Sequence, residues 1–308
     1  MTTKTSIAGI NLNSYIFNAS GPRDVTLAEL KKIGQSAASA IMIKSCTIKP
    51  RIGNEEPRYA TLAYGSIQSM GLPNLGYREY VKIIPVLKKY GKPVFASVAG
   101  LSPADFPVMV KAFQQTAVDA IEVNLSCPNI KGKPQIAYDF SSADKVLKKI
   151  CKLGKKPLGV KLPAYCDLAQ QQAMAKSIKK YGVKFVTCIN SLGNCLVINS
   201  DQERPVIKPK NGLGALGGSY IKPIALANVR IFYELLPKDI SIIGVGGIAS
   251  GFDAFEFLLA GASAVQVGTA FQEQGASCFK KIDNQLTKIL DQKGYGSISS
   301  AKGKLKFL

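Results

Sequence analysis

Eight short apolar runs, each followed by a segment with helical periodicity, limit the folds open to this chain more than any other feature. The runs open near residues 15, 40, 93, 120, 158, 185, 240 and 264. Their apolar residues are continuous rather than alternating, which is typical of parallel strands buried on both faces. Eight strand–helix units in 308 residues predict an α/β fold, a (β/α)8 TIM barrel, in a single domain over residues 1–308.

Three stretches interrupt this alternation. Residues 5–17 predict an N-terminal β-hairpin around Gly9-Ile10-Asn11. Residues 45–76, after the second barrel strand, and 191–218, after the sixth, are rich in turn-forming residues and follow no regular period. Insertions of this length in a compact domain are usually functional.

Composition and charge limit the classes of protein to which this chain can belong. No uninterrupted apolar run approaches the roughly 20 residues that a membrane span needs, and the N-terminus lacks the pattern of a secretory leader. We therefore expect a cytoplasmic protein without a membrane partner. The formal charge of +20 comes mostly from lysine pairs scattered over helix-like segments. This distribution favours a solvated outer surface, which can attract small anions, over a nucleic-acid partner.

The chain has seven cysteines and no histidine. Without a CxxC pair or a histidine, no metal site is expected. The missing histidine also excludes Ser-His and Cys-His pairs, so a general base must be Cys, Lys, Tyr or a carboxylate. Cys127 is the leading candidate, because it lies in the polar loop Asn124–Gln135 directly after an apolar run, where a reactive thiol can meet a substrate.

The expected C-terminal ends of the strands carry the other candidate groups, as barrels of this type require. These ends are Ser20-Gly21, Lys44-Ser45, Asn124 with Cys127, Lys161, Asn190-Ser191, Gly246-Gly247 and Gly268-Thr269. The last two lie where barrels commonly bind a phosphate through backbone N–H groups. Lys44 and Lys161 should project into the barrel mouth, where a lysine can either form a Schiff base or stabilise a developing anion.

Several ordered motifs carry a family resemblance that runs essentially from end to end. They are Asn18-Ala19-Ser20-Gly21, Lys44-Ser45, Pro57-Arg58-Tyr59, Ser69 to Gly76, Asn124 to Gln135, Gly159 to Pro163, Ile207 to Lys210 with Gly217-Gly218, and Gly246-Gly247. With these motifs the chain resembles class 1A dihydroorotate dehydrogenases, which are FMN-containing barrels of pyrimidine biosynthesis.

The resemblance implies an FMN site formed by Ser20, Lys44, Ser45, Asn124, Lys161, Ile189, Ser191, Gly218, Gly246, Gly247, Gly268 and Thr269. Lys161 would stabilise negative charge on the reduced ring, and Cys127 would take the proton from C5 of (S)-dihydroorotate. The implied substrate contacts are Lys44, Gln68, Met70, Gly71, Leu72, Asn124, Asn129, Asn190 and Ser191. Orotate as product, fumarate as electron acceptor with succinate as its product, and a homodimer are implied in the same way.

Two positions depart from the family pattern. Gln68 stands where members have Asn, and a carboxamide displaced by about 1 Å can cost roughly 10²-fold in rate. Either the loop compensates, or the protein is an FMN oxidoreductase acting on a different cyclic amide or pyrimidine. Arg23-Asp24 stands where uncharged residues are usual. From another class, a non-redox lyase using a Lys161 Schiff base is a further alternative.

Overall fold

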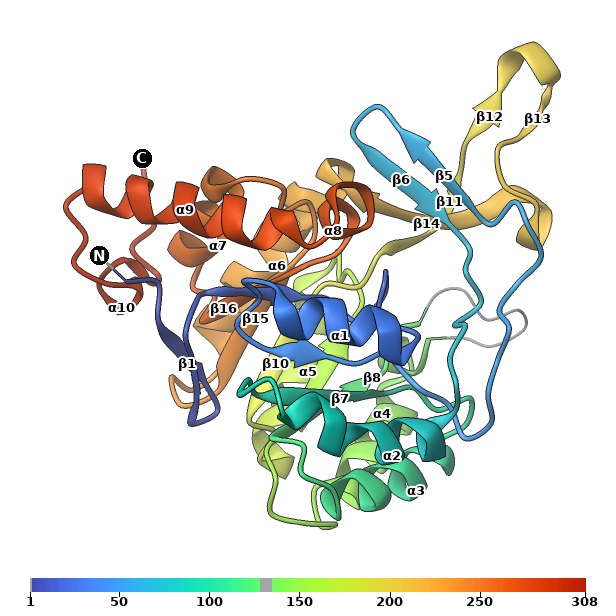
Figure 1. Ribbon diagram of the computed structural model, residues 1–308, viewed down its shortest axis with the longest axis horizontal. Coiled ribbons are helices and arrows are strands. Elements are labelled where there is room, and N and C mark those ends of the chain that lie inside the picture. The colour runs from blue at the N-terminus through green and yellow to red at the C-terminus, as the bar shows by residue number, and fades with distance from the viewer. Residues whose placement is uncertain (1, 128–134) are drawn as a thin grey trace.

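The computed structural model describes residues 2–127 and 135–308, and it confirms the predicted barrel (Figure 1). Eight parallel strands form a nearly closed sheet in the order β3-β16-β15-β10-β9-β8-β7-β4. Their bounds are β3 (Ile16–Asn18), β4 (Ile41–Met42), β7 (Val94–Val98), β8 (Ala120–Asn124), β9 (Leu158–Leu162), β10 (Phe185–Cys188), β15 (Ser241–Val245) and β16 (Ala264–Val267). Every predicted apolar run therefore contains or adjoins one barrel strand.

Helices surround this sheet (Figure 1). They are α1 (Leu27–Gln35), α2 (Tyr77–Lys88), α3 (Asp105–Gln114), α4 (Phe140–Ile150), α5 (Leu168–Tyr181), α6 (Lys222–Leu235), α7 (Gly251–Ala260), α8 (Thr269–Gln274), α9 (Ser277–Gln292) and α10 (Ile298–Ala301). α1 begins at a capping box, in which Thr26 and Glu29 exchange both expected hydrogen bonds. Across the described ranges, no helix combines the length and apolar character needed to cross a membrane.

Aromatic rings fill part of the barrel interior. The centroid of the Phe95 ring lies 5.7 Å from that of Phe17 and 6.0 Å from that of Phe185, and all three side chains are fully buried. Gly159 in β9 makes room for them, since a Cβ there would lie 2.1 Å from the Phe185 ring. This packed interior is a core rather than a pore, so ligands must bind at the strand ends.

The side chain of Asn18 closes the barrel between β3 and β4, the two ends of the sheet order. Its Nδ2 donates to the carbonyl of Met42 at 2.8 Å, and its Oδ1 accepts from the N–H of Met42 at 3.0 Å. Asn18 is fully buried. A side-chain amide thus satisfies backbone groups that a neighbouring strand would otherwise bond.

The two long insertions pair with each other over the barrel mouth (Figure 1). They form a four-stranded antiparallel sheet, here named the lid sheet, in the order β11-β14-β6-β5. Its strands are β5 (Tyr59–Leu62), β6 (Gly65–Gln68), β11 (Leu192–Leu196) and β14 (Leu213–Gly218). The sequence predicts the insertions but not this pairing, which joins segments about 150 residues apart.

Smaller elements complete the chain. β1 (Thr5–Ile7) and β2 (Ile10–Leu12) form the predicted N-terminal hairpin. β12 (Ile198–Asn199) and β13 (Arg204–Pro205) form a second hairpin that projects beyond the lid sheet (Figure 1). Short 3-10 turns are η1 (Ile136–Tyr138), η2 (Ser200–Gln202), η3 (Pro209–Gly212) and η4 (Ser219–Ile221).

Replacing Asn18 with Ala should destabilise the barrel at its closure. The change leaves a buried N–H and a buried carbonyl of Met42 without their partner, which costs about 2–4 kcal/mol of unfolding free energy. The measurement is the midpoint of urea unfolding. Asn11→Ala, at an exposed position of β2, is the control and should leave the midpoint unchanged. Equal midpoints for both variants would contradict a closing role for Asn18.

Candidate active site

A cavity of about 1020 Å³ lies at the C-terminal ends of the barrel strands and is walled on one side by the lid sheet. Most of the predicted site residues line it, namely Ser20, Lys44, Ser45, Gln68, Met70, Leu72, Asn124, Cys127, Lys161, Ile189, Asn190, Ser191, Gly218, Gly246, Gly247, Gly268 and Thr269. Gly71 is not among the lining residues, and Asn129 falls outside the described residues. Apart from these two, the predicted cofactor and substrate residues share one cavity.

Hydrogen bonds cross the barrel mouth from strand to strand. The Oγ of Ser45 lies 2.7 Å from the Oγ of Ser97 and 2.9 Å from that of Ser20. It also accepts a bond from Nδ2 of Asn124 at 3.1 Å. The Nδ2 of Asn190 lies 3.4 Å from Oδ1 of Asn124. These bonds orient the hydroxyl and amide groups before a ligand arrives, which is the preorganisation that a catalytic site needs.

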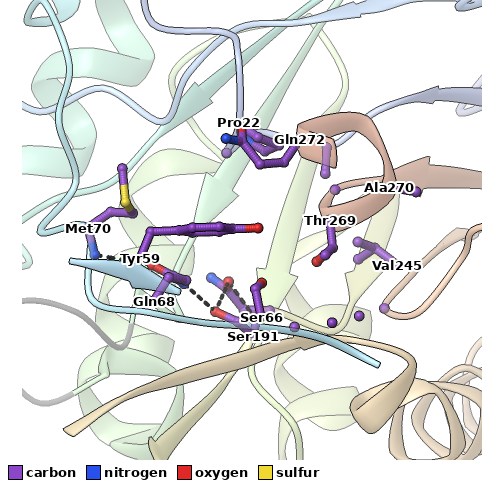
Figure 2. Close-up of a pocket in the computed structure, with 18 of the residues that line it drawn as sticks. Pro22, Tyr59, Ser66, Gln68, Met70, Ser191, Val245, Thr269, Ala270 and Gln272 are labelled. Atoms are coloured by element: carbon purple, nitrogen blue, oxygen red, sulfur yellow. Dashed lines mark hydrogen bonds between the residues drawn. The ribbon is translucent and has the colours of Figure 1, made fainter. Parts of the chain in front are cut away.

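Gln68, which departs from the family pattern, is held within the protein at both ends of its amide (Figure 2). Its Nε2 donates to the Oγ of Ser191 at 3.1 Å, and its Oε1 accepts from the N–H of Met70 at 3.1 Å. The N–H of Ser191 in turn donates to Oδ1 of Asn190 at 2.9 Å. The longer side chain thus links the lid sheet to the end of β10.

Lys161, in β9, is 3% exposed and lies above a buried polar cluster. Its Nζ is 3.4 Å from Oε1 of Gln266. Glu122 accepts hydrogen bonds from Gln266 at 3.0 Å and from Thr187 at 2.7 Å. Burial lowers the pKa of Lys161, while the nearby charges of Glu122 and Asp24 act in the opposite direction. A buried ammonium supported by a carboxylate is suited to stabilising a negative charge in the cavity.

Glycines contribute much of the wall at the predicted phosphate site. Gly247 has a φ of +76°, and a Cβ there would lie 2.7 Å from the Cβ of Lys222 and 3.0 Å from the carbonyl oxygen of Gly218. On the facing element, Gly268 precedes Thr269, the first residue of α8. Gly218, Gly246, Gly247 and Gly268 line this part of the cavity without side chains of their own. Backbone groups there can approach phosphate oxygens closely, so this part of the cavity fits a phosphate.

Cys127 differs from the buried cysteines of the chain. It is half-buried, follows β8 and lines the cavity close to Asn124. Cys46 and Cys188 are fully buried, and burial raises the pKa of both thiols well above the usual range. A thiol in an apolar interior is inert, whereas one on a polar cavity wall can transfer a proton.

Tyr59 is a cavity residue that the sequence analysis did not assign to the site. Its ring extends into the cavity toward the side on which Thr269 lies (Figure 2). Its hydroxyl oxygen is buried and has no hydrogen-bond partner within the described ranges. Buried polar atoms are usually bonded, so this hydroxyl suits a ligand contact. In the sequence, the motif Pro57-Arg58-Tyr59 is the feature that points to this residue. Its position in the cavity depends on the lid sheet, because Tyr59 begins β5.

The cavity as a whole fits a phosphate-bearing planar ligand together with a small polar substrate. Its volume of about 1020 Å³ is at the upper end of ligand sites, which range over roughly 300–1,000 Å³. The glycine-rich wall suits the phosphate, and the lysine and carboxamide groups suit a heterocycle that forms many hydrogen bonds. The described residues thus fit FMN.

Comparison with known proteins agrees with this geometry. A family model described as "Dihydroorotate dehydrogenase" matches residues 2–290. The chain is 47% identical to the putative dihydroorotate dehydrogenase A (fumarate) of Streptococcus uberis, over 100% of this chain and 99% of the relative. It is also 47% identical to dihydroorotate dehydrogenase A (fumarate) of Lactococcus lactis, over 99% of each chain. The chain belongs to the dihydroorotate dehydrogenase family, within its class 1A.

Proposed function

We propose that the cavity binds FMN and (S)-dihydroorotate, and that the chain oxidises dihydroorotate to orotate in pyrimidine biosynthesis. The observation that carries the proposal is the shared cavity, in which the glycine-rich wall, the buried Lys161 and the thiol of Cys127 occur together in a chain of this family. The names of the relatives, which include "(fumarate)", support fumarate as the electron acceptor, with succinate as its product.

The proposed FMN contacts follow the arrangement of the cavity walls. The phosphate would be held by Gly218, Gly246, Gly247, Gly268 and Thr269, and the ring by Ser20, Lys44, Ser45, Asn124, Lys161, Ile189 and Ser191. Bound FMN supplies the acceptor for the hydride that leaves C6 of the substrate. Lys161, with Glu122 behind it through Gln266, holds a positive charge beside the ring.

The substrate would be gripped by amide and hydroxyl groups that the protein already orients. Lys44, Asn124, Asn190 and Ser191 supply donors to the ring and carboxylate, and Gln68 fixes the backbone of Met70. Cys127 takes the proton from C5. Contacts from Gly71, Leu72 and Asn129 stay predictions of the family resemblance.

The structure gives less support to the two alternative functions, a different cyclic amide substrate and a Lys161 Schiff-base lyase. A different cyclic amide was suggested because Gln68 could displace the substrate, but the bonds of Gln68 to Ser191 and Met70 accommodate its length within the protein. A Lys161 Schiff base requires an amine that can reach a substrate carbonyl. Lys161 lines the cavity, but its Nζ lies beside Gln266, and the matching family and relatives are dihydroorotate dehydrogenases rather than lyases.

We also propose that residues 1–308 act as one FMN-binding domain and that two copies form a homodimer. The hairpin β12–β13 supports association, because it projects from the barrel (Figure 1) and carries apolar side chains in solvent. Ile198 is 60% exposed, and Leu196, in the adjoining strand β11, is 49% exposed. Apolar groups concentrated on a projecting arm mark interaction surfaces.

Replacing Cys127 with Ala should slow the anaerobic reduction of bound FMN by dihydroorotate by about 10²–10⁴-fold, the usual contribution of a general base. The flavin content should stay unchanged, because the thiol is expected to contact the substrate rather than to hold the cofactor. Stopped-flow loss of flavin absorbance is the measurement. Cys166→Ala, at an exposed thiol, is the matched control. Equal reduction rates in the two variants would remove Cys127 from the proposed role.

Replacing Gln68 with Ala should raise the KM for dihydroorotate by about 10-fold or more, since two hydrogen bonds that order the substrate loop are lost, each contributing roughly 0.5–1.5 kcal/mol. Steady-state kinetics gives the value. Gln292→Ala, at an exposed position, controls for the loss of a glutamine. An unchanged KM would show that the Gln68 bonds do not position the substrate.

A further inference from the structure

Asp24 is a fully buried carboxylate beside the barrel mouth, in the segment that joins β3 to α1. Its Oδ2 accepts a hydrogen bond from the N–H of Gly21 at 2.8 Å. Its Oδ1 lies 3.7 Å from Nζ of Lys44 and has no hydrogen-bond partner in the described part of the chain. Lys44 also donates to the carbonyl of Gly21. Asp24, Gly21 and Lys44 therefore form a closed triangle, of which Gly21 and Lys44 line the cavity.

Burying a carboxylate is energetically unfavourable unless other interactions compensate for the lost hydration. Removing a charge from water costs several kcal/mol, which is offset only where the charge is paired and hydrogen-bonded. Burial raises the pKa of Asp24 to about 6, while Lys44 and the N–H of Gly21 oppose the rise. Asp24 also stands where the family resemblance predicts an uncharged residue. The ion-pair partner of the carboxylate, Lys44, is a proposed ligand-binding residue.

The two lysines of the cavity each have a buried carboxylate nearby. Lys161 is connected to Glu122 through Gln266, and Lys44 is paired with Asp24. The positive charge of Lys44 lowers the pKa of Lys161, and the negative charge of Asp24 raises it. Asp24 therefore influences both cations of the site rather than Lys44 alone.

We propose that Asp24 is a positioning residue: its carboxylate holds the Lys44 ammonium against the Gly21 carbonyl and offsets one positive charge at the ligand site. The positioning of Lys44 by Asp24 is inferred from the geometry, whereas the effect of Asp24 on FMN rests on the proposed function. Removing the carboxylate should release Lys44 and make the cavity more positive toward an anionic ligand. Reduced flavin is such a ligand, so its formation should become more favourable.

The extent to which Asp24 offsets positive charge at the ligand site should depend on pH. The titratable groups that face Asp24 are Lys44 on the β4 side, Glu29 of α1, Lys161 of β9 and Tyr80 of α2. Because the pKa of Asp24 is raised to about 6, its carboxylate is ionised at pH 8 and gains a proton as the pH falls below 6. The protein at pH 5 should then resemble a variant without the charge.

The first test needs no cofactor and measures how fast an acylating reagent modifies Lys44, by mass spectrometry of the purified protein. Asp24→Asn should increase the rate about 10-fold or more, because a buried opposite charge no longer holds the Lys44 amine against the Gly21 carbonyl, and the amine becomes accessible to the reagent. Asp24→Ser should do the same if the Asn variant folds poorly. Glu273→Gln removes a charge from the exposed rim of the same cavity and should leave the rate unchanged.

The second test measures the reduction potential of bound flavin. Asp24→Asn should favour the reduced form about 10-fold at pH 8, which is about 30 mV for a two-electron couple, and the difference from wild type should vanish at pH 5. A merely structural role would lower thermal stability without this pH-dependent shift. Glu273→Gln again is the control.

The outcomes separate the two proposals. An unchanged Lys44 modification rate in Asp24→Asn and Asp24→Ser overturns the positioning role, whether or not flavin is present. Faster modification with an unchanged potential overturns the effect on the ligand site. A colourless wild-type protein counts against the proposed function, and the modification rates still decide the role of Asp24.

Discussion

The burial of two lysines at the open end of a packed barrel is the constraint on which the rest of the site depends. Lys44 and Lys161 are 5% and 3% exposed, and a buried ammonium is stable only with partners that replace water. The barrel supplies them from several strands, since Glu122, Gln266 and Thr187 form a polar layer below Lys161. Each lysine, with a buried carboxylate nearby, can then stabilise negative charge that develops on a ligand.

The lid sheet completes the site by bringing the two long insertions together. β6 pairs with β14, and Gln68 at the end of β6 bonds to Ser191 beyond β10. The hydrogen bonds of the barrel mouth therefore continue into the lid sheet. This continuity explains how an unusual residue at position 68 is compatible with the family's chemistry. The longer side chain of Gln68 is accommodated because its amide forms hydrogen bonds with Ser191 and Met70.

The sequence predicts the parts of the structure that local patterns determine. Continuous apolar runs located the eight barrel strands, and the Thr26–Glu29 pair located the start of α1. Most strand-end residues could also be placed in one cavity, because parallel strands in a barrel end at the same face. The lid sheet could not be predicted, since its register depends on contacts between distant segments. The burial of Asp24 and of the Tyr59 hydroxyl likewise could not be predicted, because it results from tertiary packing rather than from their own neighbours in sequence.

We propose that one cavity holds FMN and that the protein uses this FMN to oxidise dihydroorotate. Anaerobic titration of the purified protein with dihydroorotate, followed by flavin absorbance, tests it most directly. We expect a yellow protein whose flavin is bleached by about one equivalent of dihydroorotate and recovers its colour when fumarate is added. A colourless protein, or a flavin that dihydroorotate does not bleach, would contradict the claim.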